Sequence, residues 1–243
     1  MIMKTIIVIT ILSLGTAIKL PSNFQKCNRK QPDLKECILK AAQHGTTQLT
    51  RPYSELNIPN VDPYELTEMS LSGGDGPVAV DQKFTNCKFY GLPQMKLKQF
   101  EFDFDKKKLD VKGTFPEIQM ECNYEMKGRI LVLPVNGQGD STVILKNLKI
   151  TNLFKYQEIK KKNKTYINFL SGELTMDPEL VTFNFRNRVD RRLSDNLNPV
   201  LNENWKEIFD DVKSSYAEVI NQIVLNLLNK FFSKLSLEEA LDD

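Results

Sequence analysis

The chain has 243 residues, of which 41% are apolar and 26% are charged, and this composition is typical of a globular protein with a sizeable core. Its 33 basic and 31 acidic residues give a formal net charge of +2. That near balance argues against nucleic-acid binding, because such binding depends on many Lys and Arg side chains that neutralise phosphates. The chain holds a single histidine, His44, so a histidine-rich zinc site cannot form, and we expect neither a metal nor a cofactor.

The first residues have the pattern of a secretory signal. Lys4 precedes an apolar run over residues 5–14, and three small residues ending at Ala17 follow the run. The run is shorter than the about 20 apolar residues that a membrane-spanning helix needs. We therefore expect residues 1–17 to be a cleaved signal peptide and residues 18–243 to form one secreted, extracellular domain.

Secretion changes the expected chemistry of the four cysteines, because an oxidising compartment allows thiols to pair. Cys27 and Cys37 stand ten positions apart with Pro32 between them, and a disulfide there would close a small loop. Cys87 and Cys122 lie in two strand-like segments, where they would either bridge adjacent strands or remain buried free thiols. Neither pair has the close C-x-x-C spacing of a metal site.

The first predicted helix begins after Pro32 and ends near Gly45, since glycine is a common helix stop. Its apolar face holds Leu34, Cys37, Ile38 and Ala41.

From about Leu66 to Phe185 the apolar residues alternate with polar ones, and such alternation places one face of a strand inward and the other in water. The predicted strands cover residues 82–90, 100–104, 108–115, 117–135, 143–151, 166–176 and 180–185, with turns at 91–93, 136–137 and 177–178. Because no helical pattern interrupts this succession, it indicates an antiparallel meander.

Two features mark the stretch near residue 160 as a hairpin tip. Asn163 begins an N-glycosylation sequon, which in a secreted chain predicts an exposed loop. The run from Lys155 to Lys164 includes three adjacent lysines at positions 160–162. The run is either a solvated tip or a weak contact for anionic lipid headgroups.

The last sixth of the chain has a helical period. Apolar residues recur every three or four positions from Trp205 to Phe232, with no Gly or Pro among them. The pattern predicts one helix from about Asn202 to Lys234, about 45–50 Å long at 1.5 Å per residue. Near its end the apolar positions become adjacent pairs, so the helix needs cover on more than one side. We therefore predict an α+β fold, in which a strongly curved antiparallel β-sheet wraps around one long C-terminal α-helix and a short N-terminal helix precedes the sheet.

Four features now stand in order along the chain. They are the secretory signal, the pair Cys27 and Cys37 before the first helix, the segment 124–139 with Gly-Arg-Ile-Leu-Val-Leu-Pro at 128–134 and Gly-Gln-Gly at 137–139, and Leu-Asn-Glu-Asn-Trp at 201–205 before the long helix. Over essentially the whole mature chain they closely resemble the insect takeout and juvenile-hormone-binding protein family.

The resemblance implies a secreted carrier of small lipophilic molecules, with an elongated apolar cavity around the long helix. It also implies a disulfide between Cys27 and Cys37 that fixes the N-terminal arm close to one end of the cavity. The hormone-binding branch has its second disulfide late in the chain, whereas the last cysteine here is Cys122. This departure favours a takeout-like member and leaves the ligand open.

A carrier needs inward apolar residues beyond those that pack against each other, and a few polar groups that orient the ligand. On the long helix the candidate cavity residues are Val219, Ile223, Leu227 and Phe231. Ile38 and Ala41 would line the mouth, and the hydroxyls of Tyr124 and Tyr216 would meet an epoxide, ester or carbonyl. For each of these residues the alternative is ordinary packing.

The main hypothesis is a monomeric, non-enzymatic carrier of a juvenile-hormone-like terpenoid, a fatty acid or a hydrophobic semiochemical. One alternative is a membrane-surface lipid-binding or lipid-transfer protein that docks through the tip at Lys155–Lys164. The other is a secreted hydrolase. The sequence offers it only scattered Ser, Asp and Glu residues and the single histidine His44, with no G-x-S-x-G motif. His44 also stands seven positions after Cys37, but a disulfide would remove that thiol as a nucleophile.

Overall fold

The computed structural model describes residues 20–189 and 191–242, so the expected signal peptide lies outside the described residues. A seven-stranded antiparallel sheet forms most of the protein. Its strands are β2 (Tyr64–Leu71), β3 (Val78–Tyr90), β4 (Lys96–Asp103), β5 (Lys108–Ile130), β6 (Leu133–Lys161), β7 (Lys164–Asp177) and β8 (Leu180–Asn187). The helices are α1 (Leu34–Gln48), α2 (Arg191–Glu203), α3 (Trp205–Phe232) and the single turn α4 (Leu237–Ala240).

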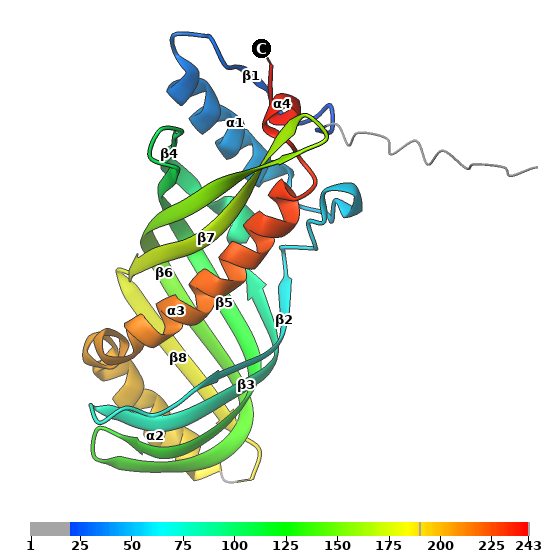
Figure 1. Ribbon diagram of the computed structural model, residues 1–243. Coiled ribbons are helices and arrows are strands. Elements are labelled where there is room, and N and C mark those ends of the chain that lie inside the picture. Colours follow the sequence, from blue (N-terminus) through cyan, green and yellow to red (C-terminus); the bar gives the residue numbers. More distant parts are fainter. Residues whose placement is uncertain (1–19, 190, 243) are drawn as a thin grey trace, which may run out of the picture.

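The sheet is built on two long central strands, β5 and β6. The first part of β5 pairs with β4 and the later part with β3, while β6 pairs first with β8 and then with β7. Strand β2 extends the sheet beyond β3. The sheet is strongly curved, and α3 lies along its concave side, with α2 at one end of the molecule and α1 and α4 at the other (Figure 1). The fold is therefore α+β, with a large curved antiparallel sheet and few helices.

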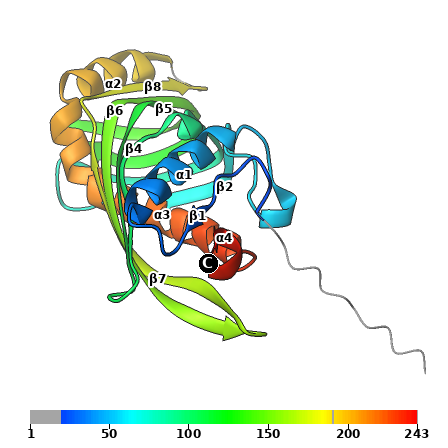
Figure 2. The ribbon, with the colours of Figure 1, turned by 90° about the horizontal axis from the view of Figure 1, so that it is seen from above.

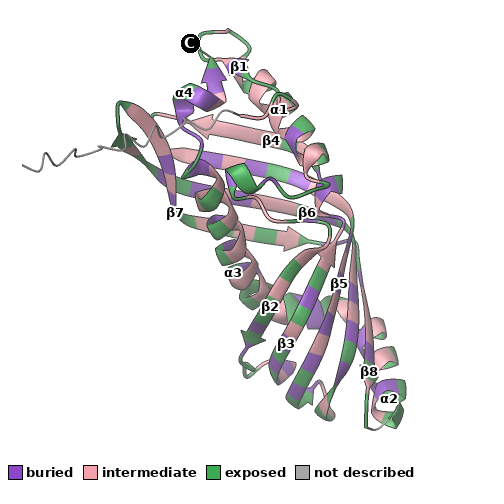
Figure 3. Ribbon diagram, turned by 90° about the vertical axis from the view of Figure 1, so that its right-hand side faces the viewer, coloured by how far each residue is buried: buried purple, intermediate pink, exposed green. Residues whose placement is uncertain are grey.

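Alternation of side chains along the strands explains this arrangement, because it gives each strand an inward apolar row and an outward polar row. Buried and exposed residues follow one another along β3 and β5 (Figure 3). In β5 the buried positions are odd-numbered up to Gly113 and even-numbered from Ile118. The two runs predicted at 108–115 and 117–135 are therefore largely parts of one strand. Near Pro116 the side chains that point inward change from the odd-numbered to the even-numbered positions.

The structure corrects the predicted boundaries at the β5–β6 hairpin and in the C-terminal region. Residues 136–137, predicted as a turn, lie inside β6, and the β5–β6 hairpin turns instead at Leu131 and Val132, where Leu131 has a φ of +53°. In the C-terminal region, α2 was not predicted, because it is polar and contains Pro199, a residue that usually ends a helix. The helix predicted over residues 202–234 corresponds to the end of α2, a break at Asn204, and α3.

Side-chain amides attach three helices to edge strands of the sheet. Asn229 of α3 donates from Nδ2 to the Phe169 carbonyl at 2.9 Å and accepts the Phe169 N–H at 2.7 Å. Asn198 and Asn202 of α2 likewise donate to a backbone carbonyl and accept a backbone N–H, at Phe185 and Phe183 respectively. Gln43 of α1 donates to the Met95 carbonyl and accepts the Leu97 N–H. An edge strand leaves backbone donors and acceptors unpaired, and these amides satisfy them as a further strand would.

The two ends of the described chain meet at the end of the molecule that holds α1 (Figure 2). Strand β1 (Cys27–Asn28) pairs in parallel with β9 (Leu241–Asp242), and a disulfide joins Cys27 to Cys37 of α1, with 5.9 Å between their Cα atoms. A second disulfide joins Cys87 of β3 to Cys122 of β5. The N-terminal arm is thus tied both to α1 and to the C-terminal segment.

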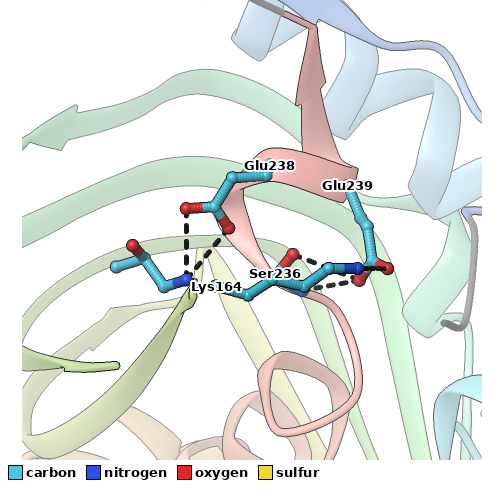
Figure 4. A network of polar contacts seen from close by, with 5 residues as sticks. Lys164, Ser236, Glu238 and Glu239 are labelled. Carbon is cyan, nitrogen blue, oxygen red and sulfur yellow. Dashed lines mark hydrogen bonds and ion pairs between the residues drawn. The ribbon is translucent and has the colours of Figure 1, made fainter. Parts of the chain in front are cut away.

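Helix α4 is held against the β6–β7 hairpin by two carboxylates, Glu238 and Glu239 (Figure 4). Ser236 and Glu239 form a capping box at the start of α4. Glu239 also pairs with the Lys164 ammonium, and both carboxylate oxygens of Glu238 accept the backbone N–H of Thr165, at 2.9 and 3.1 Å. We call this group, residues 27–28, 164–165 and 236–242, the terminal clasp.

Candidate ligand cavity

A cavity of about 350 Å³ lies between the concave face of the sheet and α3. All seven strands of the sheet or their adjoining loops, together with α2 and α3, contribute to its wall. Along α3 the lining extends from Ile208 to Leu228, about 30 Å at 1.5 Å per residue. Cavities that hold small molecules have volumes of roughly 300–1,000 Å³. The cavity is therefore long and narrow, and large enough for one small molecule.

The wall of this cavity is almost entirely aliphatic and aromatic. Among the described residues that line it, only Tyr64, Gln82, Asn152 and Tyr216 carry a side-chain oxygen or nitrogen. No carboxylate, imidazole, ammonium or thiol of the described residues stands in this lining. The wall is suited to holding an apolar molecule and orienting it through a few neutral polar groups.

Three of the residues proposed from the sequence stand in the wall: Tyr216, Ile223 and Leu227. With Ile220 and Val224 they form the face of α3 that is turned to the sheet. Val219 and Phe231 lie on the same side of α3 but outside the lining. Val219 is partly buried and packs against the core cluster that includes Met69 and Phe84, and the Phe231 ring packs against the Phe232 ring with centroids 4.9 Å apart.

The remaining proposed residues also lie outside the lining. Tyr124 is buried against the Phe185 ring in an edge-to-face contact, with centroids 5.0 Å apart. Ile38 and Ala41 are half-buried on α1, which packs against β4 rather than against the cavity. In this structure, therefore, the wall is formed by α3, α2 and the sheet.

A polar pair crosses the cavity wall from α3 to β3. The Tyr216 hydroxyl donates a hydrogen bond of 2.7 Å to Oε1 of Gln82. Burial raises the pKa of Tyr216, which keeps the hydroxyl protonated and able to donate. Gln82 occupies an inward position of β3 between Val80 and Phe84, and this interruption of an apolar row is the sequence signal that could have identified it.

A second polar group links α3 to β6 and β7. Asn221 is 5% exposed and donates from Nδ2 to the Gly172 carbonyl at 2.8 Å, while its Oδ1 accepts Nδ2 of Asn152 at 3.2 Å. Asn152 is 3% exposed, and its Oδ1 has no hydrogen-bond partner among the described residues. Glycine is required at 172, because a Cβ there would stand 2.4 Å from Oδ1 of Asn221 and 2.8 Å from the Phe154 ring.

Asn152 and Asn221 were absent from the residues proposed from the sequence, although the sequence carries a signal for Asn152. Its inward neighbours in β6 are apolar: Leu148 and Ile150 precede the amide and Phe154 follows it. A polar residue at such a position needs a partner or a function.

The family model of the haemolymph juvenile hormone binding protein (JHBP) matches residues 5–242. The chain belongs to this family. The circadian clock-controlled protein daywake of Drosophila yakuba is 21% identical over 229 residues, covering 90% of this chain and 87% of the relative. Daywake of Drosophila melanogaster is 22% identical over 232 residues, covering 91% and 88%.

The crystal structure of Epiphyas postvittana Takeout 1 has the same fold, with a TM-score of 0.78 and 22% sequence identity. The match covers 90% of this chain and 99% of Takeout 1. The resemblance to the takeout and juvenile-hormone-binding family is thus confirmed. In this chain Gly139, from the motif that carried the resemblance, allows close strand pairing, since a Cβ there would stand 1.9 Å from the Arg186 carbonyl oxygen of β8.

The lysine-rich hairpin tip lies at the turn between β6 and β7. Lys162 and Asn163 form a two-residue turn with φ of +49° and +61°, and both are exposed. Lys155, Lys160 and Lys161 are exposed as well, whereas Lys164 pairs with Glu239 in the terminal clasp. No helix among residues 20–189 and 191–242 is long and apolar enough to cross a membrane.

Proposed function

We propose that the chain is a secreted, monomeric, non-catalytic carrier that holds one small lipophilic molecule in the cavity beside α3. The observation that carries the proposal is the apolar lining of a cavity of about 350 Å³. Moving an apolar molecule from water into such a space is favourable by roughly 25 cal/mol for each Å² of apolar surface buried. A juvenile-hormone-like terpenoid, a fatty acid or a hydrophobic semiochemical has the required character.

Four further features support this role. The matched family is named for hormone binding in the haemolymph, and both disulfides suit an oxidising extracellular compartment. Residues 1–17 would direct secretion, leaving residues 18–243 as a single ligand-binding domain. The cavity lining offers no carboxylate, imidazole or thiol for catalysis, as far as the described residues go.

Binding of the fluorescent apolar probe N-phenyl-1-naphthylamine tests the proposal. The Ile223→Trp variant places a larger side chain in the wall and should weaken probe binding at least tenfold. Gln222→Trp is the matched control, because Gln222 is exposed on the neighbouring position of α3 and should leave binding unchanged. If the wild-type chain takes up no probe, or if both variants bind it like the wild type, the cavity is not the binding site.

A second candidate is contact with anionic membranes through Lys155 and Lys160–Lys162, which are exposed at the hairpin tip. Asn163 stands on the same turn, and we propose it as a glycan acceptor. A glycan there would cover the lysines, so the two proposals compete. Flotation of unglycosylated protein with phosphatidylserine vesicles should show salt-sensitive binding if the tip docks, and no binding would contradict docking.

A further inference from the structure

We propose that the cavity selects a lipophilic molecule bearing a hydroxyl group, and that this hydroxyl donates a hydrogen bond to Oδ1 of Asn152. This inference rests on the proposed carrier function and narrows the class of ligand. It predicts that a lipophilic alcohol is preferred over an ether, ester, epoxide or hydrocarbon of the same size.

The orientation of the two amides follows from the backbone of β7. The Gly172 carbonyl can only accept, so Asn221 must turn its Nδ2 toward Gly172. Oδ1 of Asn221 then faces Asn152 and can only accept, so Asn152 must turn its own Nδ2 toward Asn221. The remaining polar atom is therefore Oδ1 of Asn152, which has no hydrogen-bond partner among the described residues. It has less than 1 Å² of accessible surface, so a ligand hydroxyl reaches it when the neighbouring apolar side chains of the wall move aside.

A buried acceptor without a partner is costly, so the site gains when a donor arrives. Ethers, esters and epoxides offer only acceptors, and an ionised fatty acid would bring negative charge against the amide oxygen. A neutral hydroxyl supplies the missing donor. The Gln82 and Tyr216 pair differs in this respect, because the Tyr216 hydroxyl already donates to Oε1 of Gln82.

A water molecule is poorly suited to the site beside Oδ1 of Asn152. A buried water usually makes two to four hydrogen bonds. Around Asn152 the wall is apolar: Ile150 and Phe154 flank it in the inward row of β6, and Leu174 of β7 stands opposite it. A hydroxyl carried on an apolar chain satisfies the amide oxygen and fills the apolar surroundings at the same time.

Two isomers, dodecan-1-ol and 1-methoxyundecane, test the inference, because they have the same atoms but only the alcohol can donate. Competition against N-phenyl-1-naphthylamine should show about tenfold tighter binding of the alcohol to the wild-type chain. Asn152→Leu should remove this preference and keep the affinity for the ether. Thr151→Leu, a half-exposed neighbour outside the lining, is the control and should keep the preference.

The wild-type comparison needs no substitution, so the inference stays testable even if Asn152→Leu fails to fold. Equal binding of the two isomers to the wild-type chain would overturn the inference and leave the carrier function standing. A preference that survives in a folded Asn152→Leu variant would overturn the assignment to Asn152. If neither the isomers nor the probe bind, the carrier function fails and this inference fails with it.

Discussion

At the scale of single residues, the cavity depends on a few polar side chains placed among apolar ones. Ile223 and Leu227 could be proposed from the sequence because apolar helix positions at three- and four-residue spacing tend to face a core. Gln82 was missed because it stands at the very start of the predicted strand 82–90, and Asn152 was missed because it lies just beyond the end of the predicted strand 143–151. Their roles depend on Tyr216 and Asn221, which lie far away in the sequence.

The Tyr216 hydroxyl should make stability depend on pH in alkaline solution. Burial raises its pKa above the ordinary value of 10.0, so the folded state keeps a proton that the unfolded state loses. The free energy of unfolding should therefore fall as the pH rises above about 10. Tyr156 contributes in the same direction, because burial, followed by Glu158 and Asp103, raises its pKa to about 12.

The Tyr216→Phe variant tests this residue directly. It leaves Oε1 of Gln82 without its donor, which should cost about 1–3 kcal/mol of unfolding free energy at pH 7 in urea denaturation. Between pH 9 and pH 11 the free energy of unfolding of the variant should fall less than that of the wild type, because the variant lacks the Tyr216 hydroxyl whose pKa is raised in the folded state. Parallel pH curves for the two proteins would contradict the assignment.

At the scale of elements, the sequence predicted strands better than it predicted where they end. The period of two identified most of the sheet, but β6 runs from Leu133 to Lys161, well beyond the predicted 143–151. Residues 136–142 are polar or glycine and are held by pairing with β5 and β8, whereas residues 152–161, which include Phe154 and Tyr156, pair with β7. Helix α2 was missed for a related reason: Asn198 and Asn202 are poor helix formers that stay in place because they bind the β8 backbone.

The amide contacts at the sheet edges predict a marked difference between two asparagines of α3. Asn229→Ala should lower the free energy of unfolding by about 1–3 kcal/mol, because both backbone groups of Phe169 lose their partner. Asn226 is exposed on the same helix, and Asn226→Ala should change stability by less than about 0.5 kcal/mol. Urea denaturation of both variants measures the difference, and equal effects would show that the edge contact contributes nothing.

At the scale of the whole molecule, the terminal clasp joins both ends of the chain beside the β6–β7 hairpin. Desolvation is the largest single effect on the pKa of its carboxylates, Glu238 and Glu239, and raises it, but several hydrogen bonds together lower the pKa below its ordinary value. These bonds come from Thr165 to Glu238 and from Lys164 and Ser236 to Glu239. A carboxylate whose pKa is lower in the folded state stabilises the folded protein at a pH above its unfolded pKa of 4.5. This stabilisation is lost as the pH falls below that value.

Amide hydrogen exchange should therefore show the clasp opening before the sheet when the pH is lowered from 6 to 3, after correction for the intrinsic exchange rates. Residues 236–242 should lose protection while β5 and β6 keep theirs. Replacing Glu239 by Gln should produce part of this loss already at pH 6, because the ion pair with Lys164 is absent. Uniform loss of protection across clasp and sheet would contradict an independent clasp.

The curved sheet around a central helix could be predicted because a broad apolar helix face needs cover and alternating strands supply it. The size of the cavity could not, since it depends on how far the inward side chains of strands distant in sequence fill the space beside α3. The volume of the cavity depends on the tertiary packing of residues such as Phe154 and Tyr216, which cannot be derived from the composition.

Native mass spectrometry of the protein, purified without detergent from the tissue that produces it, tests the carrier function most directly. We predict one small apolar molecule per chain, released on denaturation and replaced by N-phenyl-1-naphthylamine in competition. The carrier function would be contradicted if only the mass of the unliganded chain were observed and the probe did not bind to that protein.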